Sequence, residues 1–276
     1  MLDEWLSLVD LAVAEDIGPF DATGSLVPRR RSRFVVRSRQ AGTLAGAVLI
    51  PPVLERVAAR VGSRIPLYTP VVVDGAHVAS GTVIGSIDGD SRCVLAAERI
   101  VLNFVTHLSG VASATAKCVL AAGGQTHIRD TRKTMPGYRS LEKYAVTCGG
   151  GVNHRMGLYD AILIKDNHLA LTPMAELVVK AKKLYPLLPI EIEVDTLQQL
   201  REAIDLEVPL VLLDNFSTSQ VREAVTLAQG TATRLEVSGG VTLATIPELA
   251  ATGVDYLAVG EITHSAPALD IGVDEE

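Results

Sequence analysis

The stretch Ile190-Glu-Ile-Glu-Val-Asp195 shows the pattern that decides the fold, an apolar run that ends in polar residues. The pattern recurs at His127–Arg132, Ala161–Asp166, Leu210–Asn215, Leu235–Ser238 and Tyr256–Glu261. Helical patterns alternate with these runs, at Pro173–Leu184, Leu197–Leu206, Ser219–Ala228 and Leu243–Ala251. Because buried strands that alternate with helices form parallel sheets, we predict an α/β fold. About six strands are visible, which does not establish a closed eight-stranded barrel.

The first part of the chain shows a different pattern. Apolar residues recur at helical spacing from Leu2 to Val13, and Gly18-Pro19 ends this helical pattern. Short β runs follow, which glycine residues separate: Phe34–Arg39, Leu67–Val73 and Val83–Ile87. This mixture predicts a small α+β domain.

A strongly apolar helical stretch begins near Val94, and we expect Gly110 to divide it into two helices. The domain boundary is expected in this region. We assign residues 1–108 to the N-terminal α+β domain and residues 109–276 to the α/β-barrel domain, with the last residues packing back on the first domain.

The amino-acid composition and net charge of the chain exclude several classes of protein. A hydrophobic content of 48% indicates a globular protein, and a net charge of −7 argues against a nucleic-acid surface. The start of the chain lacks the basic and apolar segments of a signal peptide, and we expect no membrane span. Three scattered cysteines fit a reducing compartment. We therefore expect a cytoplasmic protein that binds neither nucleic acid nor membrane.

Positive charge is concentrated between Arg129 and His168, although the chain as a whole is acidic. Arg132 and Lys133 close one predicted strand, His154 and Arg155 follow a glycine run, and Lys165 closes the next strand. In a barrel these side chains converge on one mouth. Two arginine forks with lysine charges match a planar dicarboxylate, whereas any one of these residues could instead form a surface salt bridge.

Carboxylates and glycines follow the other predicted strands. Glu191, Glu193 and Asp195 share one strand face, and Asp214 ends the next strand. Such carboxylates suit magnesium or ribose hydroxyl groups, although Glu191 and Asp195 could equally well neutralise Lys165 or Arg132.

Two glycine sequences follow the last two strands. Ser238-Gly239-Gly240 comes after the penultimate strand, and Gly260 closes the last one. Loops at these positions of a barrel commonly bind phosphate through backbone N–H groups, so a 5′-phosphate site is expected here. Gly149–Gly151 could bind phosphate or simply allow a close turn beside His154.

Several longer motifs resemble the quinolinate phosphoribosyltransferase family. They are Asp130–Gly137, Glu142–Ala145, Gly149–Arg155 and Leu163–His168, with shorter matches at Asp16–Gly18, Ala97–Arg99, Leu213–Phe216, Ser238–Gly240 and Asp255–Gly260. The resemblance covers nearly the whole chain. It implies an incomplete, six- or seven-stranded α/β barrel with an N-terminal α+β domain.

The resemblance also implies a reaction and its partners. The family transfers the phosphoribosyl group of phosphoribosyl pyrophosphate to quinolinate, with decarboxylation, in de novo NAD biosynthesis. Nicotinate mononucleotide, pyrophosphate and CO2 are the products, and Mg2+ is the expected cofactor.

Roles for individual residues follow from the resemblance. It implies that Arg132, Lys133, His154, Arg155 and Lys165 bind the two carboxylates of quinolinate. Glu193 and Asp214 lie near the ribose and the metal, and with Lys133 and Lys165 they form the expected catalytic set. Arg99 is expected to reach the site of the neighbouring subunit, which makes a homodimer the minimal active unit.

Three alternatives remain open from the sequence. Lys165 could form a Schiff base, as in barrel aldolases. A relative associated with molybdenum transport shares the fold and part of the motif set. A non-catalytic phosphate-binding module would bind ligand without releasing pyrophosphate.

Overall fold

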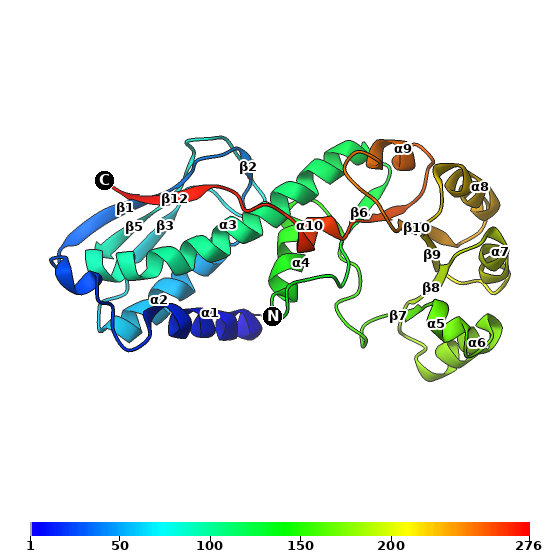
Figure 1. Ribbon diagram of the computed structural model, residues 1–276, viewed down its shortest axis with the longest axis horizontal. Helices are drawn as coiled ribbons and strands as arrows, with labels where there is room; N and C mark the ends of the chain where they lie inside the picture. Colours follow the sequence, from blue (N-terminus) through cyan, green and yellow to red (C-terminus); the bar gives the residue numbers. More distant parts are fainter. Residues whose placement is uncertain (1) are drawn as a thin grey trace. The chain divides into compact units, whose positions relative to one another are not determined.

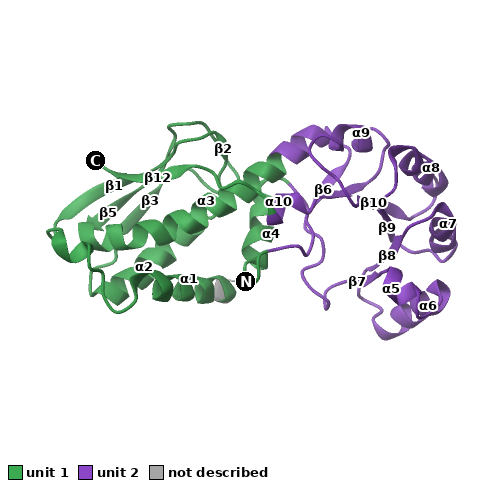
Figure 2. Cartoon of the chain, in the orientation of Figure 1, with its two compact units in different colours: residues 1–116, 135–150, 265–276 green, residues 117–134, 151–264 purple. Residues whose placement is uncertain are grey.

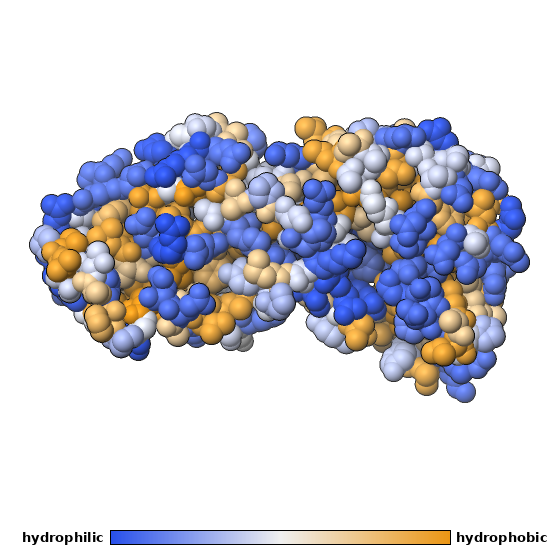
Figure 3. All heavy atoms as spheres, viewed as in Figure 1, coloured by the Kyte–Doolittle hydropathy of each residue, from blue (hydrophilic) through white to orange (hydrophobic). Residues whose placement is uncertain are grey.

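The computed structural model describes residues 2–276, and the chain forms two compact units (Figure 2). The first unit comprises residues 1–116, 135–150 and 265–276, and the second comprises residues 117–134 and 151–264. Hydrophilic and apolar residues are interspersed on the visible face of each unit (Figure 3).

The first unit contains a four-stranded antiparallel sheet in the order β12-β1-β5-β3 and a two-stranded sheet, β2-β4. The strands are β1 (Arg31–Ser38), β2 (Gly42–Thr43), β3 (Leu67–Pro70), β4 (His77–Val78), β5 (Val83–Asp90) and β12 (Ile271–Glu275). Its helices are α1 (Leu2–Ile17), η1 (Gly24–Leu26), η2 (Ala47–Leu49), α2 (Ile50–Val61), α4 (Arg139–Cys148) and the first part of α3 (Ser91–Ala122). The last strand of the chain therefore pairs with the first, with Val36 opposite Val273.

Helix α2 shows how the sequence builds this unit. Ile50, Val53, Leu54 and Val57 lie at helical spacing and are fully buried. Prolines occupy the first turn of α2, where their missing N–H groups are not needed, and Gly62 ends the helix in the left-handed conformation at φ 63°.

Helix α3 runs without interruption from Ser91 to Ala122, so the expected division at Gly110 was wrong. A Cβ atom at Gly110 would lie 2.3 Å from the carbonyl oxygen of Pro267. Gly110 is thus a site of close packing between α3 and the returning chain, and not a helix end. The boundary expected at residues 108 and 109 falls inside α3, whereas the units divide between residues 116 and 117.

The length and apolar composition of α3 would suffice to cross a membrane, but 61% of its most apolar window is buried inside the protein. Phe104, Val105 and Leu108 are among its fully buried residues. Such burial is the pattern of a core helix.

The second unit contains a six-stranded parallel sheet in the order β6-β11-β10-β9-β8-β7. Its strands are β6 (His127–Arg129), β7 (Ile162–Ile164), β8 (Ile190–Val194), β9 (Leu210–Asp214), β10 (Arg234–Ser238) and β11 (Tyr256–Ala258). Within the described residues, β6 and β7 are not paired with each other, and only an isolated bridge joins Arg129 to Val152. The prediction of an incomplete α/β barrel is confirmed.

Helices connect these strands, and α6 to α9 lie on the outer side of the sheet (Figure 1). The connecting helices are α5 (Asp166–Leu169), α6 (Met174–Leu184), α7 (Leu197–Asp205), α8 (Thr218–Ala228) and α9 (Ile246–Ala250), and α10 (Glu261–His264) follows the last strand, β11. Helices α7 and α8 begin at capping boxes, where Thr196 and Ser217 accept hydrogen bonds from the backbone N–H groups of Gln199 and Gln220. Each capping residue marks the end of the loop between strand and helix. The polar residues of this loop therefore lie at the carboxyl edge of the sheet.

Gly110→Ala tests the close packing of α3. Alanine is the better helix former, so helix propensity alone would stabilise the protein. The clash with Pro267 should instead lower the free energy of unfolding by about 1–3 kcal/mol, measured by urea denaturation. Asn103→Ala, at an exposed position of the same helix, is the matched control. A Gly110→Ala protein as stable as this control would contradict the packing role.

Candidate functional site

A pocket of about 510 Å³ opens at the carboxyl edge of the parallel sheet. Its lining contains most of the residues that the sequence predicted for a site: Arg132, Lys133, His154, Arg155, Lys165, Glu193, Asp214, Ser238, Gly239 and Gly240. Thr131, Leu163, Leu212, Asn215 and Ala258 complete the lining. Residues far apart in the sequence meet here because parallel strands end at the same edge.

Two predicted site residues lie outside this lining. Arg99 is an exposed residue of α3 in the first unit. Gly260 follows β11 and accepts a hydrogen bond from Thr263, whose hydroxyl group also donates to the carbonyl oxygen of Lys133 at 2.8 Å. Gly260 therefore supports the segment that carries Lys133. Gly149 is packed against the carbonyl oxygen of Ala112 in α3, a contact that the sequence did not predict.

Arg132 and Arg155 both belong to the lining of the pocket. Burial, and next the positive charge of Arg132, lower the pKa of Arg155, while Glu191 and Asp160 act in the opposite direction. Arg155 donates to the carbonyl oxygen of Ala161 at 3.3 Å. Two like charges in one pocket favour a ligand that carries negative charge.

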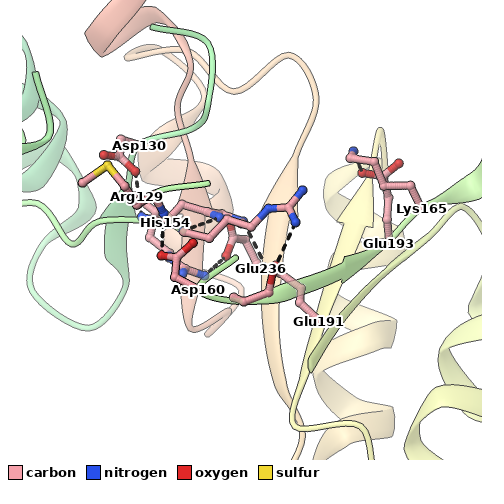
Figure 4. Close-up of polar contacts among 11 residues, drawn as sticks. Arg129, Asp130, His154, Asp160, Lys165, Glu191, Glu193 and Glu236 are labelled. Atoms are coloured by element: carbon pink, nitrogen blue, oxygen red, sulfur yellow. Dashed lines mark hydrogen bonds and ion pairs between the residues drawn. The ribbon is translucent and has the colours of Figure 1, made fainter. Parts of the chain in front are cut away.

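Lys165 and Glu193 form an ion pair at the pocket wall (Figure 4). The side chain of Lys165 is 43% exposed and that of Glu193 is 10% exposed. A lysine that forms Schiff bases is usually desolvated in an apolar pocket or placed beside another cation. The carboxylate contact of Lys165 is a different environment and disfavours the aldolase interpretation.

Glu193 and Asp214 lie at the ends of the neighbouring strands β8 and β9. Asp214 accepts a hydrogen bond from the side-chain amide of Asn215 at 2.7 Å. These carboxylate oxygens are the donor type that Mg2+ prefers. Glu193 also pairs with Lys165, which occupies one of its carboxylate oxygens.

The loop Ser238-Gly239-Gly240 follows β10. Gly239 and Gly240 adopt φ angles of 85° and 64°, which non-glycine residues rarely adopt. A Cβ atom at Gly239 would lie 2.2 Å from the side-chain oxygen of Asn215. The loop thus brings bare backbone to the pocket wall, as phosphate-binding loops do.

A buried charged cluster lies behind the pocket wall (Figure 4). The Nε2 atom of His154 is 3.1 Å from Glu191 and 3.8 Å from Glu236, and Arg129 pairs with Glu236. The backbone N–H of His154 donates to Asp130 at 2.7 Å. The three facing groups His154, Glu191 and Glu236 also have the composition of a cation site.

Sequence reasoning did not assign a role to Glu236 or Arg129. The available signal was a single carboxylate within the otherwise apolar run Leu235-Glu-Val. Glu236 is fully buried, and burial followed by the charge of Glu191 raises its pKa to about 7, against the opposing effects of Arg129 and His154. The protein therefore retains a carboxyl group in its interior at a cost in stability.

The fold and the pocket define a class: an α/β-barrel protein with a pocket of cations, carboxylates and glycines at the carboxyl edge of its sheet. The chain belongs to the quinolinate phosphoribosyl transferase family, because the models of the N-terminal and C-terminal domains of that family match residues 20–109 and 111–274. This match confirms the resemblance drawn from the motifs.

Individual relatives are similar along nearly their whole length. The nicotinate-nucleotide pyrophosphorylase (carboxylating) of Mycobacterium leprae is 45% identical, over 91% of this chain and 86% of that protein. The human protein of the same name is 31% identical, over 97% and 90%. The solved structure of the nicotinate-nucleotide pyrophosphorylase from Francisella tularensis is similar with a TM-score of 0.93 at 38% identity, covering 99% of this chain and 96% of that one.

Glu236→Gln tests the burial of charge in the cluster. The pKa of Glu236 is raised in the folded state. The contribution of this carboxyl group to the stability of the fold is therefore most favourable at a pH below its pKa in the unfolded chain, and this contribution is lost as the pH rises through about 7. Glutamine does not ionise. Between pH 5 and pH 8 the stability of Glu236→Gln should therefore rise relative to wild type, by roughly 1–3 kcal/mol.

Urea denaturation at both pH values measures this difference. Glu223→Gln, on the exposed face of α8, is the matched control and should track the wild type at both pH values. A pH-independent difference between Glu236→Gln and wild type would show that Glu236 has the same pKa in both states.

Proposed function

We propose that this protein transfers the phosphoribosyl group of phosphoribosyl pyrophosphate to quinolinate and releases pyrophosphate and CO2, giving nicotinate mononucleotide. The observation that carries the proposal is one pocket with three kinds of wall, two of which meet at the ion pair between Lys165 and Glu193. Arg132, Arg155 and Lys165 form a cationic wall, Glu193 and Asp214 an acidic one, and Ser238–Gly240 a glycine loop. The cationic wall suits a dicarboxylate, the acidic wall suits a ribose, and the glycine loop suits a phosphate.

The cationic wall binds and orients the pyridine ring. Arginine binds a carboxylate through two parallel hydrogen bonds, so Arg132 and Arg155 suit the two adjacent carboxylates of quinolinate. A bound dianion also relieves the repulsion between the two guanidinium groups. Nicotinate has one carboxylate and leaves part of this charge unmatched.

The acidic wall stabilises the charge that develops on the ribose. The pyridine nitrogen attacks C1 of the ribose, and the bond from C1 to the pyrophosphate oxygen breaks. Positive charge builds up on the ribose, and the carboxylates of Glu193 and Asp214 are placed to stabilise it. Lys133 and Lys165 offset the charge of the leaving pyrophosphate.

Decarboxylation then follows from the new bond. The ring nitrogen is now cationic and accepts electron density when the bond between C2 and its carboxylate breaks. CO2 leaves, and C2 takes up a proton. No covalent intermediate with the protein is needed.

Further parts of the proposal concern the cofactor and the assembly. Mg2+, held by Glu193 and Asp214, would neutralise the pyrophosphate of the bound substrate. A homodimer in which Arg99 completes the neighbouring site would be the active unit, and the protein would act in the cytoplasm.

The other interpretations receive less support. The relatives carry the name of the pyrophosphorylase, which does not favour the molybdenum-transport alternative. A non-catalytic module would need no acidic wall beside the ribose.

Pyrophosphate release tests the proposed function. Purified protein, Mg2+ and phosphoribosyl pyrophosphate are incubated with quinolinate or with nicotinate. Release should occur with quinolinate only, together with nicotinate mononucleotide. Release with nicotinate alone would overturn the substrate assignment, and no release with either would overturn the enzymatic function.

Arg132→Ala tests the cationic wall. Arg132 is exposed, so the fold should remain intact, while loss of one guanidinium group should lower kcat/KM for quinolinate at least about 100-fold. Arg201→Ala, at an exposed position of α7, is the matched control. If Arg132→Ala turned over quinolinate as fast as this control, the pocket assignment would be wrong.

A further inference from the structure

Two members of the cationic wall, Arg132 and Arg155, come from the open side of the barrel. Strand β6 is an edge strand; beyond it the N–H of Val152 donates to Ile128 at 2.8 Å, and the hydroxyl group of Thr263 donates to the carbonyl oxygen of Lys133 at 2.8 Å. Arg132 and Arg155 lie on this part of the chain. Backbone hydrogen bonds of the sheet therefore do little to place their side chains.

Glu236 reaches this region from the middle of the sheet. Its strand, β10, is paired on both sides, with β9 and β11. One oxygen of Glu236 pairs with Arg129 at the end of β6, and the other lies 3.8 Å from Nε2 of His154 (Figure 4). A single carboxylate thus reaches the two segments that carry Arg132 and Arg155, and Glu191 lies nearer to Nε2 of His154, at 3.1 Å.

We propose that Glu236 is a positioning residue for quinolinate, holding Arg129 and His154 across the open side of the barrel. The placement of Arg132 and Arg155 follows from this contact, because they lie three residues and one residue further along the chain. The inference rests on the proposed function and names a residue that acts through the substrate-binding groups.

The energetic cost of the cluster supports a functional role. Barrel interiors are normally filled by layers of branched apolar side chains. Here a buried ion pair occupies that place, and Glu236 and Glu191 each retain one buried oxygen without a hydrogen-bond partner in the described structure. Apolar residues often replace a buried ion pair without loss of stability. A purely structural role would not require these charges.

The role predicts a larger effect on one substrate than on the other. The glycine loop is held from β9, where the N–H of Asn215 donates to the carbonyl oxygen of Ser238 at 3.0 Å, so the KM for phosphoribosyl pyrophosphate should depend on the placement of Arg129 and His154 only through Lys133. The KM for quinolinate should depend on it strongly, since small displacements of binding groups weaken the interaction.

Two variants separate positioning from folding. Glu236→Gln keeps the shape of the side chain but removes its charge. The double variant Arg129→Leu with Glu236→Leu removes both charges, so neither remains buried alone. Glu223→Gln is the matched control. Thermal melts establish folding, and steady-state kinetics at pH 8 give the KM for each substrate and kcat.

The double variant should fold, and its KM for quinolinate should rise at least about tenfold, while the KM for phosphoribosyl pyrophosphate should rise by a clearly smaller factor, about threefold or less. Glu236→Gln should show the same selective change. A KM for quinolinate within about twofold of wild type in the folded double variant would overturn the proposal. So would an equal rise in both KM values, or failure of both variants to fold. If wild type itself releases no pyrophosphate, the proposed function fails instead.

Discussion

The pocket depends on charge that the protein holds inside an open barrel. The ion pair between Arg129 and Glu236 joins an edge strand to a central one, and His154 lies beside it. A closed barrel would hold its edge through backbone hydrogen bonds, but this sheet has a gap between β6 and β7. The gap leaves space for the chain that carries Arg132 and Arg155. Buried side-chain contacts stabilise this edge in place of the hydrogen bonds that a further pair of strands would form.

The same constraint explains the electrostatics of the site. The positive charge of Arg132 acts on Arg155, and Glu193 forms an ion pair with Lys165 in the same pocket. In the proposed function, a dianionic ring would satisfy the guanidinium groups, and the phosphorylated sugar would extend towards the glycine loop. Groups held in place by the protein in this way would need little reorganisation during the reaction.

Much of this could be predicted from the sequence, because strand periodicity and the position of polar residues after each strand are local signals. They located the parallel strands and most of the residues in the pocket lining. Features set by distant packing were not predictable in the same way. Gly110 has the signature of a helix end, yet a carbonyl oxygen of Pro267 requires its small size. Glu236 looked like one polar residue in an apolar run, and its role depends on Arg129, which is 107 residues away.

The most direct test of the account is a crystal structure of the protein with quinolinate and a non-reactive analogue of phosphoribosyl pyrophosphate. We expect the two carboxylates of quinolinate between Arg132 and Arg155, the ribose beside Glu193 and Asp214, and the 5′-phosphate at Ser238–Gly240. Quinolinate bound outside this pocket, or a phosphate group in place of its carboxylates on the arginine wall, would contradict the assignment.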